Sequence, residues 1–112
     1  MTIAVRSPLE LKTLTDNRWE LFFDTGELFS ATTPFRDYLE QVRTALAQQS
    51  PAVLHLPPPH GDDDCVDGRL EWDGQTLTVY FERALSYFTL TGAHEPTMRR
   101  ALDVVRPIVA VG

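Results

Sequence analysis

The chain has 112 residues, enough for one domain but too few for two that each bury a core. Ten Lys and Arg against 16 Asp and Glu give a net charge of −6, and this sign argues against a nucleic-acid partner because phosphate binding requires a basic face. Hydrophobic residues at 43% and charged residues at 23% are typical of a globular protein, which excludes a disordered chain and a membrane protein.

Targeting signals and cysteine usage indicate where the protein works. Residues 1–9 carry one Arg and no long apolar run, so we expect no secretory signal. No stretch approaches the ~18 apolar residues of a membrane span. The only cysteine, Cys65, excludes a disulfide or a thiolate zinc site made from this chain alone and fits a reducing compartment. We therefore expect a cytoplasmic protein.

The first part of the chain alternates with period 2 over residues 9–14 and 18–24, which predicts two half-buried strands joined by a loop at 15–17. Asp24-Thr25-Gly26 is a turn signal, and a short extended piece is expected around Leu28 and Phe29.

A helix is predicted over residues 34–49, with Thr33 as N-cap and Pro34 at the first helical position. Its apolar residues form one stripe. They are Phe35, Tyr38, Leu39, Val42, Ala45 and Leu46. The helix should end before Pro51, because the residue before a proline avoids the α region.

In the second half of the chain, the sequence predicts a short strand at 52–56. Three prolines at 57–59 end it in a stiff, extended segment that leads into a surface loop at 60–64. Strands at 69–73 and 75–83 meet at the Asp73-Gly74 hairpin signal, and a third run at 85–91 completes a meander.

A second helix is predicted at 95–106, and residues 108–111 form either an edge strand or a tail. The order of elements predicts an α+β single domain, residues 1–112, in which two helices pack on one face of an antiparallel sheet of about five to six strands. We expect its core to contain Phe35, Leu39, Val42 and Leu46 of the first helix together with Trp19, Phe23, Leu77, Val79 and Phe81.

One tripeptide matches a known catalytic motif. Asp24-Thr25-Gly26 resembles the catalytic tripeptide of retroviral-type aspartic proteases, which work as dimers sharing two carboxylates. That family is almost all-β, whereas a helix follows here, so we interpret Asp24 as a turn residue without a catalytic role. No elbow around a nucleophilic serine and no glycine-rich phosphate loop is present, and the acids around Cys65 disfavour a thiolate.

A possible metal cluster, formed by His55, His60, Cys65 and the acids nearby, fails the EF-hand pattern because Gly74 stands where a bidentate Glu is needed. It also lacks a His pair at helical spacing. We expect no metal and no cofactor.

Between His60 and Asp73 there are six acids and one base, a balance of −5 out of −6. This segment is either a solvated loop or a docking patch for a basic surface. The residues predicted to bind a partner are Asp62, Asp63, Asp64, Asp67, Glu71 and Asp73, with Trp72 and Tyr80 as aromatic anchors.

The layout of residues 70–90, a strand hairpin and a third strand followed by a helix, resembles small bacterial immunity proteins of polymorphic and contact-dependent toxin systems. The resemblance implies a cytoplasmic inhibitor that neutralises a toxin domain, often a basic nuclease, by presenting acidic side chains where the toxin would hold phosphate. Two alternatives remain open: an aspartic-protease-type hydrolase that uses Asp24, and an adaptor or subunit that pairs through an edge strand such as 108–111.

Overall fold

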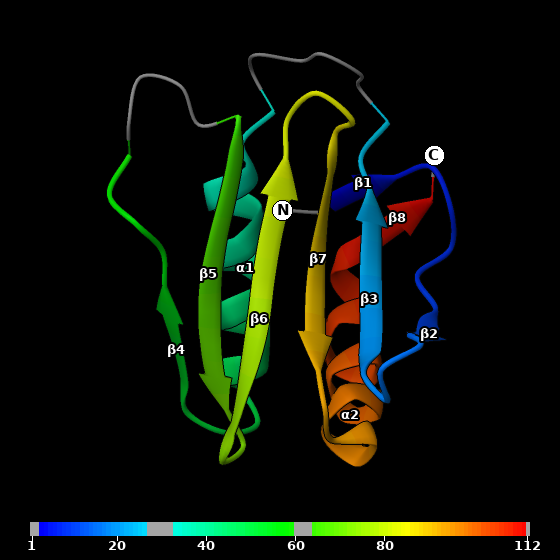
Figure 1. Ribbon diagram of the computed structural model, residues 1–112, viewed down its shortest axis with the longest axis vertical. Helices are drawn as coiled ribbons and strands as arrows, with labels where there is room; N and C mark the ends of the chain where they lie inside the picture. The colour runs from blue at the N-terminus through cyan, green and yellow to red at the C-terminus, as the bar shows by residue number, and fades with distance from the viewer. Residues whose placement is uncertain (1–2, 27–32, 60–63, 112) are drawn as a thin grey trace.

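The computed structural model describes residues 3–26, 33–59 and 64–111. A six-stranded antiparallel sheet has the strand order β2-β3-β7-β6-β5-β4 (Figure 1). Its strands are β2 (Leu11–Thr13), β3 (Trp19–Asp24), β4 (Ala52–His55), β5 (Cys65–Trp72), β6 (Gln75–Glu82) and β7 (Tyr87–Gly92). A second sheet pairs β1 (Ile3–Val5) with β8 (Val109–Val111) in parallel.

Two helices, α1 (Phe35–Ala47) and α2 (Glu95–Val105), cover one face of the large sheet. In Figure 1, α1 lies behind β5 and β6, and α2 lies behind β7 and β3, so no helix stands in front of the sheet. A 3₁₀ turn, η1 (Arg106–Ile108), leads from α2 into β8. These elements confirm the α+β class with two helices on one face of an antiparallel sheet.

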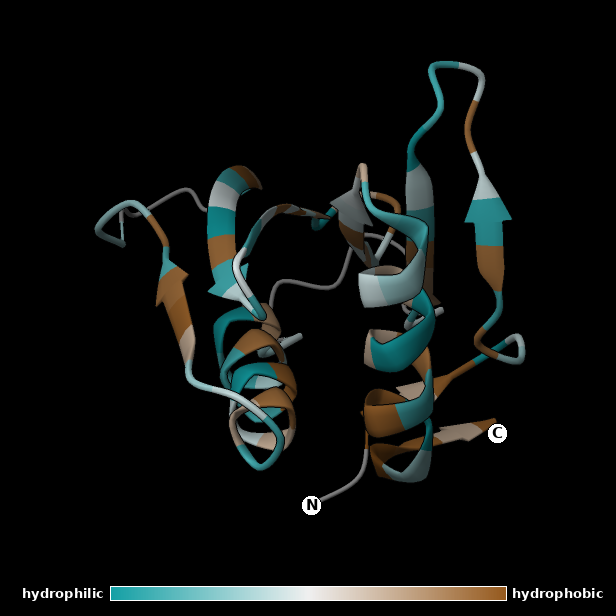
Figure 2. Ribbon diagram, turned by 90° about the horizontal axis from the view of Figure 1, so that it is seen from below, coloured by the Kyte–Doolittle hydropathy of each residue, from teal (hydrophilic) through white to brown (hydrophobic). Residues whose placement is uncertain are grey.

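The core lies between the sheet and the helices. Each helix carries brown apolar and teal polar residues in Figure 2, as an amphipathic helix requires. Apart from the half-buried Trp19, the expected core residues that the helix stripe and strands contribute are buried. These are Phe35, Leu39, Val42, Leu46, Phe23, Leu77, Val79 and Phe81.

The hairpin between β5 and β6 turns at the predicted pair. Asp73 and Gly74 both have positive φ, 55° and 73°, which matches the right-handed twist of the two strands. A Cβ placed on Gly74 would meet no atom within 4 Å, so the backbone angle alone favours glycine there.

The strand β5 begins at Cys65, four residues before the predicted start at Arg69. The sequence predicts no strand at residues 65–68, but they pair in register with β6 residues 79–82. The cross-strand partner therefore imposes an extended backbone on a segment with poor intrinsic strand propensity.

Three further expectations concern the start of α1, the end of the chain and the segment after β3. The N-cap of α1 is Pro34 without a side-chain bond, and the Thr33 hydroxyl is buried without a partner, so the predicted Thr33 cap is wrong. Of the two alternatives for residues 108–111, the strand is confirmed as β8, and its partner β1 was not predicted. The extended piece around Leu28 and Phe29 lies outside the described residues.

In the parts of the chain that the structure describes, neither helix has the length and apolar character needed to cross a bilayer.

Candidate functional site

The face of the large sheet opposite the helices, here called the open face, carries mainly accessible side chains, although Thr89 and Thr91 on it are buried. Because directly paired residues point to the same side of a sheet, the register assigns its members. From β2 to β4 they are Lys12; Glu20, Phe22 and Asp24; Tyr87, Thr89 and Thr91; Thr76, Thr78, Tyr80 and Glu82; Cys65, Asp67, Arg69 and Glu71; and Val53 and His55.

Three aromatic rings form a line across the open face, here called the ring line. Phe22 on β3 stacks on Tyr87 on β7 with 4.8 Å between ring centroids, and Tyr87 lies 5.9 Å from Tyr80 on β6. At the β3 end, the ammonium of Lys12 lies 5.2 Å from the Phe22 centroid. The ring at the β3 end of the ring line therefore already contacts a cation of the same chain.

The two phenols of the ring line are held in the neutral form. Burial raises the pKa of Tyr87, and a hydrogen bond with the Glu82 carboxylate and the charge of that carboxylate raise it further. Burial likewise raises the pKa of Tyr80, with Glu82 and then Cys65 as smaller causes. Both side chains therefore remain uncharged hydrogen-bonding aromatics at physiological pH.

The open face carries net negative charge. Five carboxylates, Glu20, Asp24, Asp67, Glu71 and Glu82, stand against two cations, Lys12 and Arg69, so its formal charge is 2 − 5 = −3. Two of these carboxylates have partners: Asp24 pairs with Arg6 at 3.6 Å, and Glu71 contacts His55 at 2.9 Å. Glu20, Asp67 and Glu82 form no ion pair with any described residue, although the Glu82 carboxylate accepts a hydrogen bond from Tyr87.

The acids of the segment 60–73 do not form one patch. Asp64 is exposed just before β5, and Asp67 and Glu71 are exposed on the open face. Asp73 lies at the opposite end of β5, in the hairpin turn, where it forms an ion pair with Arg100 of α2. Asp62 and Asp63 lie outside the described residues.

Trp72 is a core residue, so its predicted role as a surface anchor is wrong. Its side chain is 1% exposed, and the indole N–H donates to the carbonyl of Leu46 at 2.9 Å. Strand alternation places it with the inward-facing residues of β5, and the guanidinium of Arg100 lies 5.0 Å from its ring. The other predicted anchor, Tyr80, is half-buried on the open face.

Asp24 is the last residue of β3, which pairs with β2 and β7, so no hairpin follows it within the described residues. Its neighbour Thr25 fixes the chain there: the Thr25 hydroxyl donates to the Ser86 carbonyl at 2.7 Å and lies 2.6 Å from the Ser86 hydroxyl. Asp-Thr-Gly here ends a strand and ties it to the turn before β7. One carboxylate is present, and it faces Arg6.

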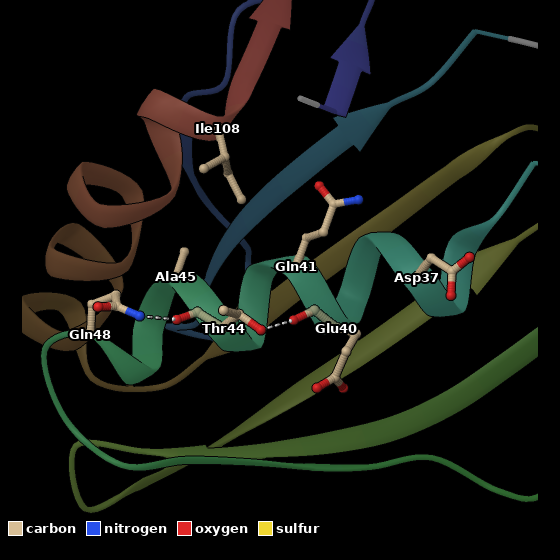
Figure 3. Close-up of a pocket in the computed structure, with 7 residues that line it drawn as sticks. All are labelled: Asp37, Glu40, Gln41, Thr44, Ala45, Gln48 and Ile108. Carbon is tan, nitrogen blue, oxygen red and sulfur yellow. Dashed lines mark hydrogen bonds between the residues drawn. The ribbon is translucent and has the colours of Figure 1, made fainter. Parts of the chain in front are cut away.

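On the helical side, a groove of about 490 Å³ lies between α1 and η1 (Figure 3). Ala45 and Ile108 supply apolar surface, while Asp37 and Glu40 stand at its acidic end. The described residues contain no group of three or more His, Cys, Asp or Glu side chains arranged to hold a metal ion. Cys65 is exposed on β5.

Phe22, Tyr87 and Glu82 were missed as site residues in the sequence. Alternation already placed Phe22 on the same side as Glu20 and Asp24, but it did not reveal that β3 lies beside β7. No protein-family model, curated protein or solved structure matches this chain.

Proposed function

We propose that this chain is a non-catalytic, protein-binding inhibitor that works in the cytoplasm as an immunity protein, and that it neutralises a toxin domain with a basic surface. The supporting observation is the open face, where a line of three rings lies among carboxylates and no helix covers the strands. Tyrosine, tryptophan and arginine are enriched among the residues that contribute most of the binding energy at protein interfaces. Excess negative charge around them speeds encounter with a basic partner.

The proposal places the interface on the sheet rather than on the acidic segment alone. Three unpaired carboxylates, Glu20, Asp67 and Glu82, belong to three different strands, so the sheet holds them at fixed spacing. A rigid array loses little conformational entropy when a partner binds. Asp64, next to β5, and the sequence neighbours Asp62 and Asp63 add further negative charge.

The test uses the protein encoded by the reading frame that adjoins this gene. That protein is produced in cells with the wild-type chain, and growth is compared with cells that lack it. We expect growth to be rescued by the wild type and lost with the triple variant Glu20→Gln, Asp67→Asn and Glu82→Gln. Absence of rescue by the wild type would overturn the proposed function.

The control variant, Asp37→Asn, Glu40→Gln and Asp103→Asn, removes the same number of charges from the helices. It should rescue growth as the wild type does, because its substitutions lie on the other layer of the fold. Equal loss of rescue in the two triple variants would show that overall charge matters and that the open face is not the interface.

A further inference from the structure

The two ends of the ring line differ. At the β3 end, the ammonium of Lys12 already lies over the ring of Phe22. At the β6 end, Tyr80 is the last ring, and the next strand on that side is β5. No cation lies over the Tyr80 ring among the cation–ring contacts of the described residues. One end of the same aromatic line is thus occupied and the other is open.

Two carboxylates without an ion-pair partner among the described residues stand at the open end, and one of them, Glu82, accepts a hydrogen bond from Tyr87. Asp67 is the residue of β5 directly opposite Tyr80, and Glu82 lies two residues further along β6 on the same face. Neither forms an ion pair with a described residue. Arg69, the closest cation on β5, is two residues from Asp67 and is not paired with it. An aromatic ring next to unpaired carboxylates attracts a cation by two independent effects.

Space for a long side chain lies beside Asp67. The strand β4 pairs only with β5 residues 69–72, so Asp67 has no β4 residue opposite it. A hollow of about 380 Å³ opens there, lined by His55, Leu56, Pro57 and residues 67–69. A side chain entering from this edge of the sheet can reach Asp67 without displacing a strand.

We propose that the Tyr80 end of the ring line, with Asp67 and Glu82, binds an arginine side chain of the basic partner. This inference rests on the proposed function and names the group on the partner that the open face recognises. A guanidinium is favoured because its planar surface stacks on a ring while its N–H groups donate to carboxylates. Lys12 on Phe22 is the intramolecular counterpart of this contact.

The site can be tested without the partner, using N-acetyl-arginine methylamide as the probe and the citrulline analogue as the neutral control of the same shape. Two-dimensional NMR of the full chain at low salt should show saturable shifts centred on residues 67, 80 and 82 with the arginine compound alone. Equal shifts with both compounds, shifts centred on the helices, or no shifts would overturn the proposal.

Variants then separate the contribution of the carboxylate from that of the aromatic ring. Asp67→Asn and Tyr80→Leu should each weaken the arginine compound about two- to fivefold, the range of an exposed ion pair or cation–ring contact. Asp103→Asn removes one charge from α2, on the other layer of the fold, so it should bind as the wild type does. Unchanged affinity in Asp67→Asn and Tyr80→Leu, with native spectra, would contradict the assignment.

The outcomes distinguish this inference from the proposed function. If the arginine compound fails to bind while the wild-type chain still rescues growth, the arginine site is wrong and the inhibitor function stands. If the compound binds as described while no rescue occurs, the site stands and the inhibitor function is wrong.

Discussion

The ring of Phe22 stacks on the ring of Tyr87 on the open face, with 4.8 Å between centroids and 21° between planes. On the opposite face of the same two strands, Phe23 stacks on Phe88 at 4.2 Å. The pairing of β3 with β7 is thus reinforced by aromatic contacts on both sides of the sheet. The outer stack is half-buried and the inner stack is fully buried, so adjacent residues of the same two strands belong to the accessible ring line and to the core.

The raised pKa values of Tyr80 and Tyr87 predict how the chain responds to alkali. Both phenols should ionise above pH 10.0, their ordinary value. As the pH rises, these phenols ionise in the unfolded chain before they ionise in the folded one. Their contribution to the free energy of unfolding should therefore be constant below about pH 10 and should decrease as the pH rises above it. Titration of tyrosinate absorbance, together with urea unfolding at several pH values, measures both effects.

The variant Glu82→Gln is the matched control for that titration. Removing the carboxylate charge should lower the pKa of Tyr87 towards its ordinary value, although burial keeps it raised. A single step near pH 10.0 for every tyrosine of the wild type would contradict the environment described for the ring line.

Leu39 on α1 tests the helix-to-sheet core. Its side chain is 2% exposed, so Leu39→Ala should lower the free energy of unfolding by about 2–5 kcal/mol through lost burial and a residual cavity. Val53→Ala, at a side chain that is 49% exposed on β4, should change it by about 0.5 kcal/mol or less. Urea unfolding of the two variants checks the difference, and similar losses would place Leu39 outside the core.

Asp73 combines a backbone role with an ion pair, and two substitutions separate them. Asp73→Asn keeps a residue that tolerates positive φ and loses only the pair with Arg100, so about 1 kcal/mol or less should be lost. Asp73→Ala should cost about 1 kcal/mol more, since alanine is strained in the left-handed region. Chemical denaturation measures both, and equal stabilities would show that the turn tolerates alanine.

Under the proposed function, the aspartates at 62, 63 and 64 should act on association with the basic partner. Changing all three to Asn should slow association and weaken its dependence on salt while leaving dissociation and stability close to those of the wild type. Stopped-flow mixing at several salt concentrations measures this. If Asp73→Asn, at the far end of β5, slowed association as much, the location of the charge would be irrelevant.

The sequence predicted those elements whose signals are local. The first helix had a complete apolar stripe, and Asp73-Gly74 specified its own turn. Strand β1 and strand β8 are three residues each, too short for a period-2 pattern, and they become strands only because they meet each other. In the same way, residues 65–68 are extended because β6 continues beside them.

The candidate site was predicted less completely, since it depends on contacts between distant strands. Counting acids along 60–73 grouped Asp73 with Asp64, but an eight-residue strand separates their positions by more than 20 Å, at about 3.3 Å per residue. The same strand alternation that turns Asp67 outwards turns Trp72 into the core. Local charge and composition therefore predicted the sign of the surface charge, while the sheet topology determined where on the surface the charged side chains lie.

The parallel pair of β1 and β8 has a consequence for the order of folding. During synthesis, residues 3–5 leave the ribosome early, and the strand that pairs with them is made after every other strand and helix of the described fold. Until then, Ile3 and Val5, both buried in the finished fold, lack the neighbours that β8 supplies. Closure of this small sheet is accordingly a late, long-range step, of the kind that slows folding through the entropy of joining distant segments.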